Sequence, residues 1–218
     1  MTIKEAMLER HSVRNYQDKA IEADKIQAIN EMIAQCNEEG KLHIQFLADA
    51  GNTFNRLLNK AMGLGSAPSV IACIGPDDET LDERIGYYGE KIVIFAQQLG
   101  LNTCWAGTYN KKNVKAVINN GERLAIVIAI GYGVNGGRTR KSKSVSDVIV
   151  GGVEDKPEWF IEGVKMALLA PTAVNQQKFE IALKGDDFEI IDKGGILSKI
   201  DKGIVKYNFE IGAGRKNS

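Results

Sequence analysis

Histidine and cysteine are scarce in this sequence, which limits the chemistry that its own side chains can perform. With only His11 and His43, an imidazole-rich metal site is excluded, and a Ser-His-Asp or Cys-His triad would have to use one of them. The three cysteines are odd in number, widely spaced and placed in or beside apolar runs, at Cys36, Cys73 and Cys104. They predict buried free thiols rather than a disulfide framework or a zinc knuckle. Demanding chemistry is therefore expected to belong to a bound cofactor.

The sequence also lacks an excess of either charge and any long apolar run. Lysine plus arginine equals aspartate plus glutamate, at 28 each, so no global field attracts nucleic acid or an acidic membrane. The charged opening MTIKEAMLER has no signal-type apolar core, and no stretch approaches the roughly 20 apolar residues of a membrane span. We therefore expect a cytoplasmic protein without a nucleic-acid or membrane partner, in which any anion site is local.

What remains is a chain of 218 residues, 44% of them hydrophobic, which can bury one substantial core or two small fused lobes. The periodicity of its apolar residues predicts a mixed α and β chain. In the first part we expect helices at 3–9, 22–36, 52–61, 82–99 and a small one at 113–118, and strands at 43–48, 69–75 and 123–133. The polar, basic, Gly-rich segment 134–144 is expected to be a surface loop.

After Gly151-Gly152 the pattern of elements begins again. A helix up to Leu169 precedes a turn and two short strands, and residues 197–214 match residues 85–102 in spacing and character. The helix and strand of 22–48 likewise match 158–183. This predicts two related halves, 1–152 and a shorter 153–218, although any two amphipathic helix and strand pairs can look alike.

The stretch RHSVRNY, 10–16, follows the first predicted helix as an extended segment. Alternate side chains of an extended segment share a face, so Arg10, Ser12 and Arg14 are expected to point together over about 13 Å. Forked guanidinium donors with a hydroxyl between them suit a long ligand with a phosphate at one end and a hydrogen-bond-accepting ring at the other. The alternative is that the basic residues only complement the dipole at the helix C-terminus.

Three further stretches could bind a ligand, and each also has a purely structural explanation. In APTAVNQQKF, 170–179, Pro171 stops a helix and a short turn gathers hydroxyl and amide groups that can read the edge of a heterocycle. In LGLNTCWAGTYN, 99–110, the small Ala106 and Gly107 allow a flat ring to approach the backbone, or else form a tight turn beside Trp105. RTRKSKS, 138–144, is either a phosphate clamp or a solvated run of charge.

Residues 131–136, GYGVNG, match the G-x-G-x-x-G pattern of dinucleotide-binding folds directly after a strand. The helix that this pattern requires is not predicted after it, and no acidic residue closes a second strand about 20 residues further on. The glycines are therefore not interpreted as a dinucleotide site, and the sequence has no P-loop motif either.

Together, the four candidate stretches resemble the nitroreductase family of FMN-dependent flavoproteins. RHSVR, 10–14, resembles the family's Arg-His/Arg-Ser-x-Arg/Lys segment, and GLNTCWAG, 100–107, its Gly-Leu-x-Thr-x-Trp-x-Gly helix end. PTAVNQQKF, 171–179, resembles Pro-Ser-x-x-Asn-x-Gln-Pro-Trp, with Lys178 and Phe179 replacing the last two residues and putting the substrate-side wall in doubt. Gly131-Tyr132 followed by Lys141-Ser-Lys143 resembles a strand ending that leads to a basic pair.

The resemblance implies an α+β, nitroreductase-like fold, with a central antiparallel or mixed sheet flanked by helices. It implies no catalytic side chain and no metal, and it places the following residues at FMN: Arg10, His11, Ser12, Arg14, Ala106, Gly107, Lys141, Lys143, Pro171, Thr172, Ala173 and Asn175. In ordinary members the Pro-Ser-x-x-Asn turn lies on the first long helix and reaches the partner subunit's flavin. Here it lies in the second half, which resembles a fused pseudo-dimer with one FMN per chain, either monomeric or a homodimer.

The reaction implied is that of an FMN-dependent oxidoreductase working by a ping-pong mechanism. NAD(P)H as co-substrate reduces the flavin, which passes electrons to a small-molecule acceptor, nitroaromatic or quinone-like. One alternative is a protein that binds FMN without turnover, for storage or sensing. Another is a structural α+β protein whose basic stretches are merely solvated.

Overall fold

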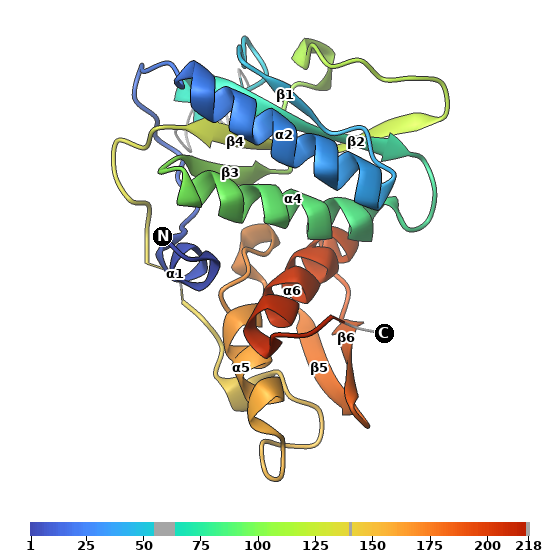
Figure 1. The fold of residues 1–218 in the computed structure, drawn as a ribbon. Helices are drawn as coiled ribbons and strands as arrows, with labels where there is room; N and C mark the ends of the chain where they lie inside the picture. The colour runs from blue at the N-terminus through green and yellow to red at the C-terminus, as the bar shows by residue number, and fades with distance from the viewer. Residues whose placement is uncertain (55–63, 140, 217–218) are drawn as a thin grey trace. The chain divides into compact units, whose positions relative to one another are not determined.

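The computed structural model describes residues 1–54, 64–139 and 141–216, and the chain divides into two compact units (Figure 1). The first comprises Met1–Leu81 and Lys91–Thr139, and the second comprises Asp82–Glu90 and Arg140–Ser218. Helix α4, Leu81–Gln98, carries the chain from the first unit into the second and back. The division into related halves at residue 152 stays a prediction.

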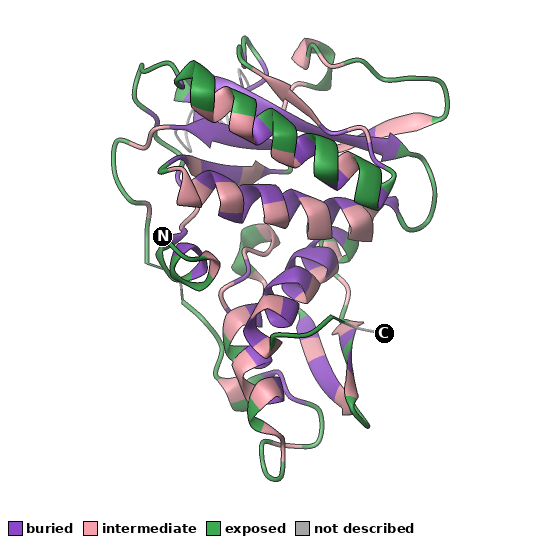
Figure 2. Cartoon of the chain, in the orientation of Figure 1, coloured by how far each residue is buried: buried purple, intermediate pink, exposed green. Residues whose placement is uncertain are grey.

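The first unit is built on a four-stranded antiparallel sheet (Figure 1). This agrees with the antiparallel or mixed sheet that the resemblance implies, although the strand Asn102–Ala106 was not among the predicted strands. Its strand order is β1-β2-β4-β3, formed by β1, Gln45–Leu47, β2, Ser69–Pro76, β4, Glu122–Gly131, and β3, Asn102–Ala106. The β-branched runs of β2 and β4 pair along their whole lengths in the middle of the sheet. Continuous apolar character is typical of strands covered on both faces, and both strands are largely buried (Figure 2).

Alternation along the central strands divides their side chains between two faces of the sheet. Val70 and Ala72 of β2 join one core cluster with Val127 and Ala129 of β4. The intervening Ile71 is fully buried on the other face, and Figure 1 shows helix α2, Ala23–Gly40, crossing the sheet. The buried residues of α2 are Ile29, Ile33, Cys36 and Gly40.

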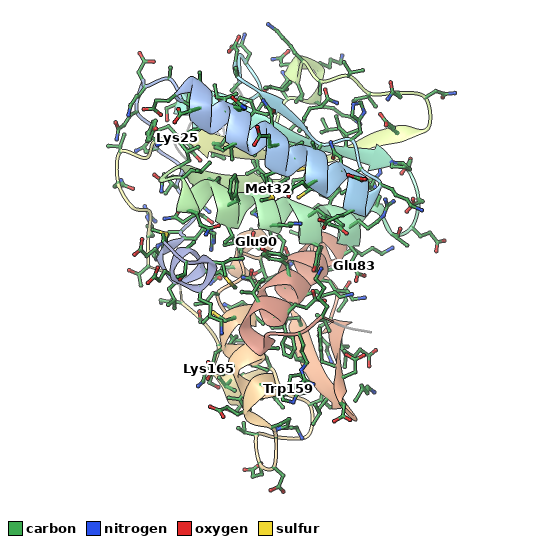
Figure 3. The ribbon with its side chains drawn as sticks, viewed as in Figure 1. Lys25, Met32, Glu83, Glu90, Trp159 and Lys165 are labelled. Carbon is green, nitrogen blue, oxygen red and sulfur yellow. The ribbon has the colours of Figure 1, made fainter. Side chains whose placement is uncertain are left out.

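Helix α2 continues four residues past its predicted end at Cys36. The polar Asn37 does not stop it, because its side-chain amide donates to Ile44 O at 2.9 Å and accepts from Ile44 N at 2.7 Å. The helix ends instead at Lys41, which takes the left-handed conformation. At the other end Lys25, labelled in Figure 3, donates to the Tyr132 hydroxyl at 2.9 Å and ties α2 to the residue after β4.

One predicted helix is wrong, and another lies mostly outside the described residues. Residues 113–118 are not helical; a single 3-10 turn, Lys111–Asn113, precedes chain without regular secondary structure. The side-chain amide of Gln45 holds that chain by donating to Val117 O at 2.7 Å and accepting from Val117 N at 3.0 Å. Of the helix predicted at 52–61, only residues 52–54 are described, and they form a turn.

The second unit packs a helix pair with a β-hairpin. In chain order its elements are α5, Glu158–Ala167, β5, Phe179–Lys184, β6, Asp187–Asp192, and α6, Ser198–Ala213. The two strands pair antiparallel. The ring centroid of Trp159 of α5, labelled in Figure 3, lies 6.4 Å from that of Phe209. The ring of Phe209 also contacts those of Phe160 and Phe188. This aromatic cluster forms the unit's core, and each predicted element of the segment is present.

The cysteines are free and buried, as predicted. Within the described ranges 1–54, 64–139 and 141–216, no group of three His, Cys, Asp or Glu side chains could hold a metal ion. No helix in the same ranges combines the length and the apolar character needed to cross a membrane.

Candidate functional site

The opening segment runs beside β3 as extended chain and is joined to it by an isolated bridge. Helix α1, Ile3–Glu9, starts at a capping box on Thr2 and ends at Arg10, whose backbone is extended. Ser12 forms a parallel bridge with Thr103 of β3, and Val13 N donates to Thr103 O at 3.0 Å. The extended conformation predicted for 10–16 is therefore observed, and it places RHSVR next to the strand that leads to Ala106.

The two arginines of this segment both act on β3. Burial raises the pKa of the Cys104 thiol, whereas the nearby positive charges of Arg14 and Arg10 lower it. Arg10 is buried and Arg14 is exposed, so the two arginines that were expected to point together differ in their exposure to solvent. The segment makes only isolated bridges at Ser12 and Tyr16 and does not alternate strictly.

His11 and the end of β3 complete this cluster. The His11 Nδ1–H donates to Glu9 O at 2.8 Å, which leaves Nε2 as the ring nitrogen for another partner. The methyl group of Ala106 lies in the core cluster, so only its backbone can meet a ligand. Gly107, which follows it, is exposed.

The glycines after β4 allow the loop to approach the opening segment. A Cβ at Gly137 would lie 2.8 Å from the Cβ of His11, and Gly137 has a φ of +85° that favours glycine. Gly133 N donates to Asn102 Oδ1 at 2.9 Å, and Gly133 bridges to Tyr16. No helix follows in the described part of 134–144, so the pattern is not a dinucleotide motif, and Gly133 and Gly137 serve close packing instead.

In the second unit, the turn after α5 has an unusual backbone. Val174, Asn175 and Gln177 have φ values of +46°, +55° and +45°. A left-handed non-glycine residue costs on the order of 1–3 kcal/mol, and most for a β-branched side chain. Val174 is also 83% exposed, so no burial of its side chain offsets that cost. Strained residues cluster at binding and active sites, which makes this turn a candidate site.

Asp201 of α6 holds one side of this turn. Its two carboxylate oxygens accept from Ala173 N at 3.0 and 3.1 Å, and Oδ2 also accepts from Gln176 Nε2 at 2.8 Å. Burial raises the pKa of Asp201 to about 6, although the hydrogen bonds from Gln176 and Ala173 act in the opposite direction. Across the turn, Gln177 N donates to Thr172 Oγ1 at 3.0 Å.

The other side of the turn is joined to the end of the basic loop. Asn175 Nδ2 and Gln177 Nε2 donate to Lys141 O at 2.8 and 2.9 Å, and Lys143 N donates to Gln177 Oε1 at 2.9 Å. The Lys143 ammonium donates to Gln177 O at 2.7 Å. Two predicted stretches thus form one cluster, in which both lysines are exposed.

The structure therefore gathers the predicted site residues into two clusters, each within one unit. The first contains Arg10, His11, Ser12, Arg14, Ala106 and Gly107, and the second contains Lys141, Lys143, Pro171, Thr172, Ala173 and Asn175. The sequence-based selection missed Gln177 and Asp201. Gln177 stood in the amide-rich turn and could have been found there, whereas nothing in the local pattern around Asp201 distinguishes it from other charged helix residues.

The protein is of the α+β class, with an antiparallel sheet flanked by helices. The charges of Arg10 and Arg14 lie near Cys104 of β3. A family model described as "Putative TM nitroreductase" matches residues 2–213. The chain belongs to this family of nitroreductases.

Solved structures agree on the fold. A "putative nitroreductase" from Thermotoga maritima MSB8 has a TM-score of 0.71 and 23% identity, over 99% of this chain and 87% of that chain. A nitroreductase family protein from Streptococcus pneumoniae TIGR4 has a TM-score of 0.54 and 14% identity, over 68% and 99%. A "Putative NADH dehydrogenase/NAD(P)H nitroreductase" from Parabacteroides distasonis ATCC 8503 has 0.53 and 16%, over 69% and 98%. No curated protein matches the sequence.

Proposed function

We propose that the protein is an FMN-dependent oxidoreductase that uses NAD(P)H to reduce a nitroaromatic or quinone-like acceptor. The observation that carries this proposal is the contact between RHSVR and β3, in which Ser12 forms a bridge with Thr103 and Val13 N donates to Thr103 O at 3.0 Å. Two stretches that resemble flavin-binding motifs thereby meet in one place, beside a backbone left open at Gly107. Membership of the nitroreductase family supports the same chemistry.

The first cluster fits the polar parts of FMN. Arg10 would bind the phosphate, since guanidinium groups are the usual partners of phosphate oxygens. Lys141 and Lys143 of the second unit are exposed and offer ammonium groups that suit a phosphate as well. Ser12 and the free ring nitrogen of His11 bind ribityl or ring oxygens. Arg14 is exposed and would meet the pyrimidine edge, where a fixed cation would stabilise negative charge.

The turn of the second unit has fewer groups to offer than its composition suggests. The Ala173 N–H is engaged by Asp201, and the Asn175 amide nitrogen by Lys141 O. The groups that we assign to the flavin are therefore the Asn175 Oδ1, the Thr172 hydroxyl hydrogen, and the apolar surfaces of Pro171 and Ala173. This mixture of polar and apolar groups fits a flat heterocycle with a polar edge.

When bound, FMN supplies two-electron redox chemistry, accepting a hydride from NAD(P)H and returning electrons to the acceptor. The chain's own residues bind and orient the cofactor. With FMN bound, the Arg14 guanidinium would stabilise negative charge on the ring and so favour its reduction. The Parabacteroides distasonis relative, which is named as an NAD(P)H nitroreductase, supports the choice of electron donor.

The position of the turn supports a fused pseudo-dimer with one FMN per chain. Residues 35–41, where ordinary family members carry the Pro-Ser-x-x-Asn turn, read QCNEEGK, and the related turn occurs only at 171–175. Flavin released by acid, divided by protein concentration, is expected to approach one per chain whether the protein is a monomer or a homodimer. Light scattering gives the oligomeric state, and a ratio near one half would contradict the fused arrangement.

The visible absorption spectrum of the purified protein with added FMN, followed by its oxidation of NAD(P)H with a quinone or nitroaromatic acceptor, tests the function. Retained yellow flavin and steady turnover are expected. Flavin without turnover would support a binding or sensing protein, and failure to bind FMN would remove the proposal.

The role of Arg14 is tested separately. Arg14→Ala is expected to raise the Kd for FMN about tenfold and to slow flavin reduction, whereas Arg14→Lys has a smaller effect because the charge remains. Arg123→Ala, which removes an arginine paired with Asp77 at 2.7 Å, is the control. If Arg14→Ala matches this control, Arg14 does not lie at the flavin.

A further inference from the structure

We propose that Gln177 is a positioning residue that holds the flavin-binding turn and the two lysines of the basic loop as one preassembled element. This inference rests on the proposed function and extends it to a residue that does not itself contact the cofactor. Gln177 is 6% exposed, so its side chain points into the protein and not toward a ligand.

The side-chain amide of Gln177 pairs with the basic loop as a neighbouring strand would. Its Nε2 donates to Lys141 O at 2.9 Å, and its Oε1 accepts from Lys143 N at 2.9 Å. One amide thus satisfies a carbonyl and an N–H two residues apart, and the two opposite roles fix its orientation. The pairing fixes the backbone on both sides of Ser142, and with it the positions from which the exposed side chains of Lys141 and Lys143 extend.

The backbone of Gln177 joins the same cluster to the turn. Its N–H donates to Thr172 Oγ1 at 3.0 Å, and its carbonyl accepts the Lys143 ammonium at 2.7 Å. All four polar groups of Gln177 therefore connect either the turn or the loop. Its φ of +45° is unfavourable for glutamine, and these contacts stabilise that conformation.

Preassembly has a consequence specific to phosphate. A loop whose lysines must be ordered during binding reduces the affinity by the cost of that ordering, whereas an ordered loop does not. Riboflavin has no phosphate and gains nothing from the lysines. Loss of Gln177 should therefore weaken FMN more than riboflavin, while a variant that merely disturbs the unit would weaken both alike.

The test uses the full chain with Gln177→Met, which keeps the buried volume and removes both hydrogen-bonding groups. Its control is Gln27→Ala on helix α2, where the exposed amide donates to Glu31 Oε1 at 2.9 Å. The Kd values for FMN and riboflavin are measured by quenching of flavin fluorescence. We expect the Kd for FMN to rise at least tenfold, the preference for FMN over riboflavin to fall at least fivefold, and the control to match the wild type.

Hydrogen exchange of the flavin-free protein gives a readout that does not involve binding. Amides of residues 141–146 should exchange at least tenfold faster in Gln177→Met, with helices α5 and α6 unchanged. If that variant does not fold, Gln177→Glu decides by the same measurement, since it keeps the acceptor for Lys143 N but loses the donor to Lys141 O. Unchanged exchange, or an unchanged preference for FMN, would overturn the inference. Wild-type protein that binds no FMN would instead remove the proposed function.

Discussion

Gly86, in the part of α4 that belongs to the second unit, and Gly203 of α6 meet where these two helices cross backbone to backbone. A Cβ at Gly86 would lie 2.0 Å from Ile200 O, and one at Gly203 would lie 2.0 Å from Glu83 O. Side chains on either side support the crossing: the Tyr87 hydroxyl donates to Glu210 Oε2 at 2.6 Å, and Lys202 pairs with Glu83, labelled in Figure 3, at 2.9 Å. The crossing fixes α6, and with it Asp201, which holds the turn.

Gly203→Ala is therefore expected to destabilise the protein by about 2–4 kcal/mol, because a methyl group there meets main-chain atoms that cannot rotate away. This loss would appear despite the gain in helix propensity of about 1 kcal/mol from glycine to alanine. Urea unfolding measures it. Gly136→Ala is the control, since a Cβ there meets nothing within 4 Å, and it should change the stability by less than about 0.5 kcal/mol. Equal stabilities for both variants would show that the crossing can relax.

The periodic elements of this fold could be predicted from the sequence because each follows a local rule. The β-branched run of β4 and the spacing of apolar residues in α4 and α6 predicted elements that the structure contains. The conformation of residues 113–118, for which a helix was wrongly predicted, does not follow from such a local rule. It depends on the side chain of Gln45, about 70 residues away in the sequence, which pairs with Val117.

The candidate site likewise contains residues that local sequence could predict and residues that it could not. RHSVR and the amide-rich turn carry their chemistry within a few consecutive residues, and a resemblance to known motifs could find them. The supporting contact from Asp201 could not be predicted, because it joins residues 28 positions apart through a helix that looks ordinary in sequence. The burial of Arg10 beside an exposed Arg14 depends on how the irregular segment lies against β3.

Val174→Gly tests whether the turn stores strain. Glycine adopts a φ of +46° without a steric penalty, and the exposed valine loses no burial, so the free energy of unfolding should rise by about 0.5–1 kcal/mol. Thermal or urea unfolding checks this. Val117→Gly, at an equally apolar and 63% exposed position without a positive φ, should instead be destabilising. A loss of stability in both variants would mean that the turn is not strained.

The three thiols are expected to be unreactive in the folded protein. Burial raises the pKa of Cys36 to about 12 and also raises those of Cys73 and Cys104, so little thiolate forms at pH 8. Ellman's reagent should modify no thiol on mixing with folded protein and all three in denaturant. Cys104 should react first when the protein opens slowly, because Arg14 and Arg10 favour its thiolate. Immediate reaction of the folded protein would contradict the burial of these side chains.

Asp201 should make stability fall as the pH rises. Its pKa of about 6 in the folded protein exceeds the value of about 3.9 in an unfolded chain, so the folded state binds the proton more tightly. This contribution is fully present below about pH 4 and is lost as the pH rises through 6. At about 1.4 kcal/mol per pKa unit, it amounts to about 3 kcal/mol. Urea unfolding between pH 4 and 7 should show this fall in wild type relative to Asp201→Asn. Residue 201 cannot titrate in the variant, so the difference between the two proteins removes the contribution of the other carboxyl groups. Parallel curves for the two proteins would place the pKa of Asp201 at its ordinary value.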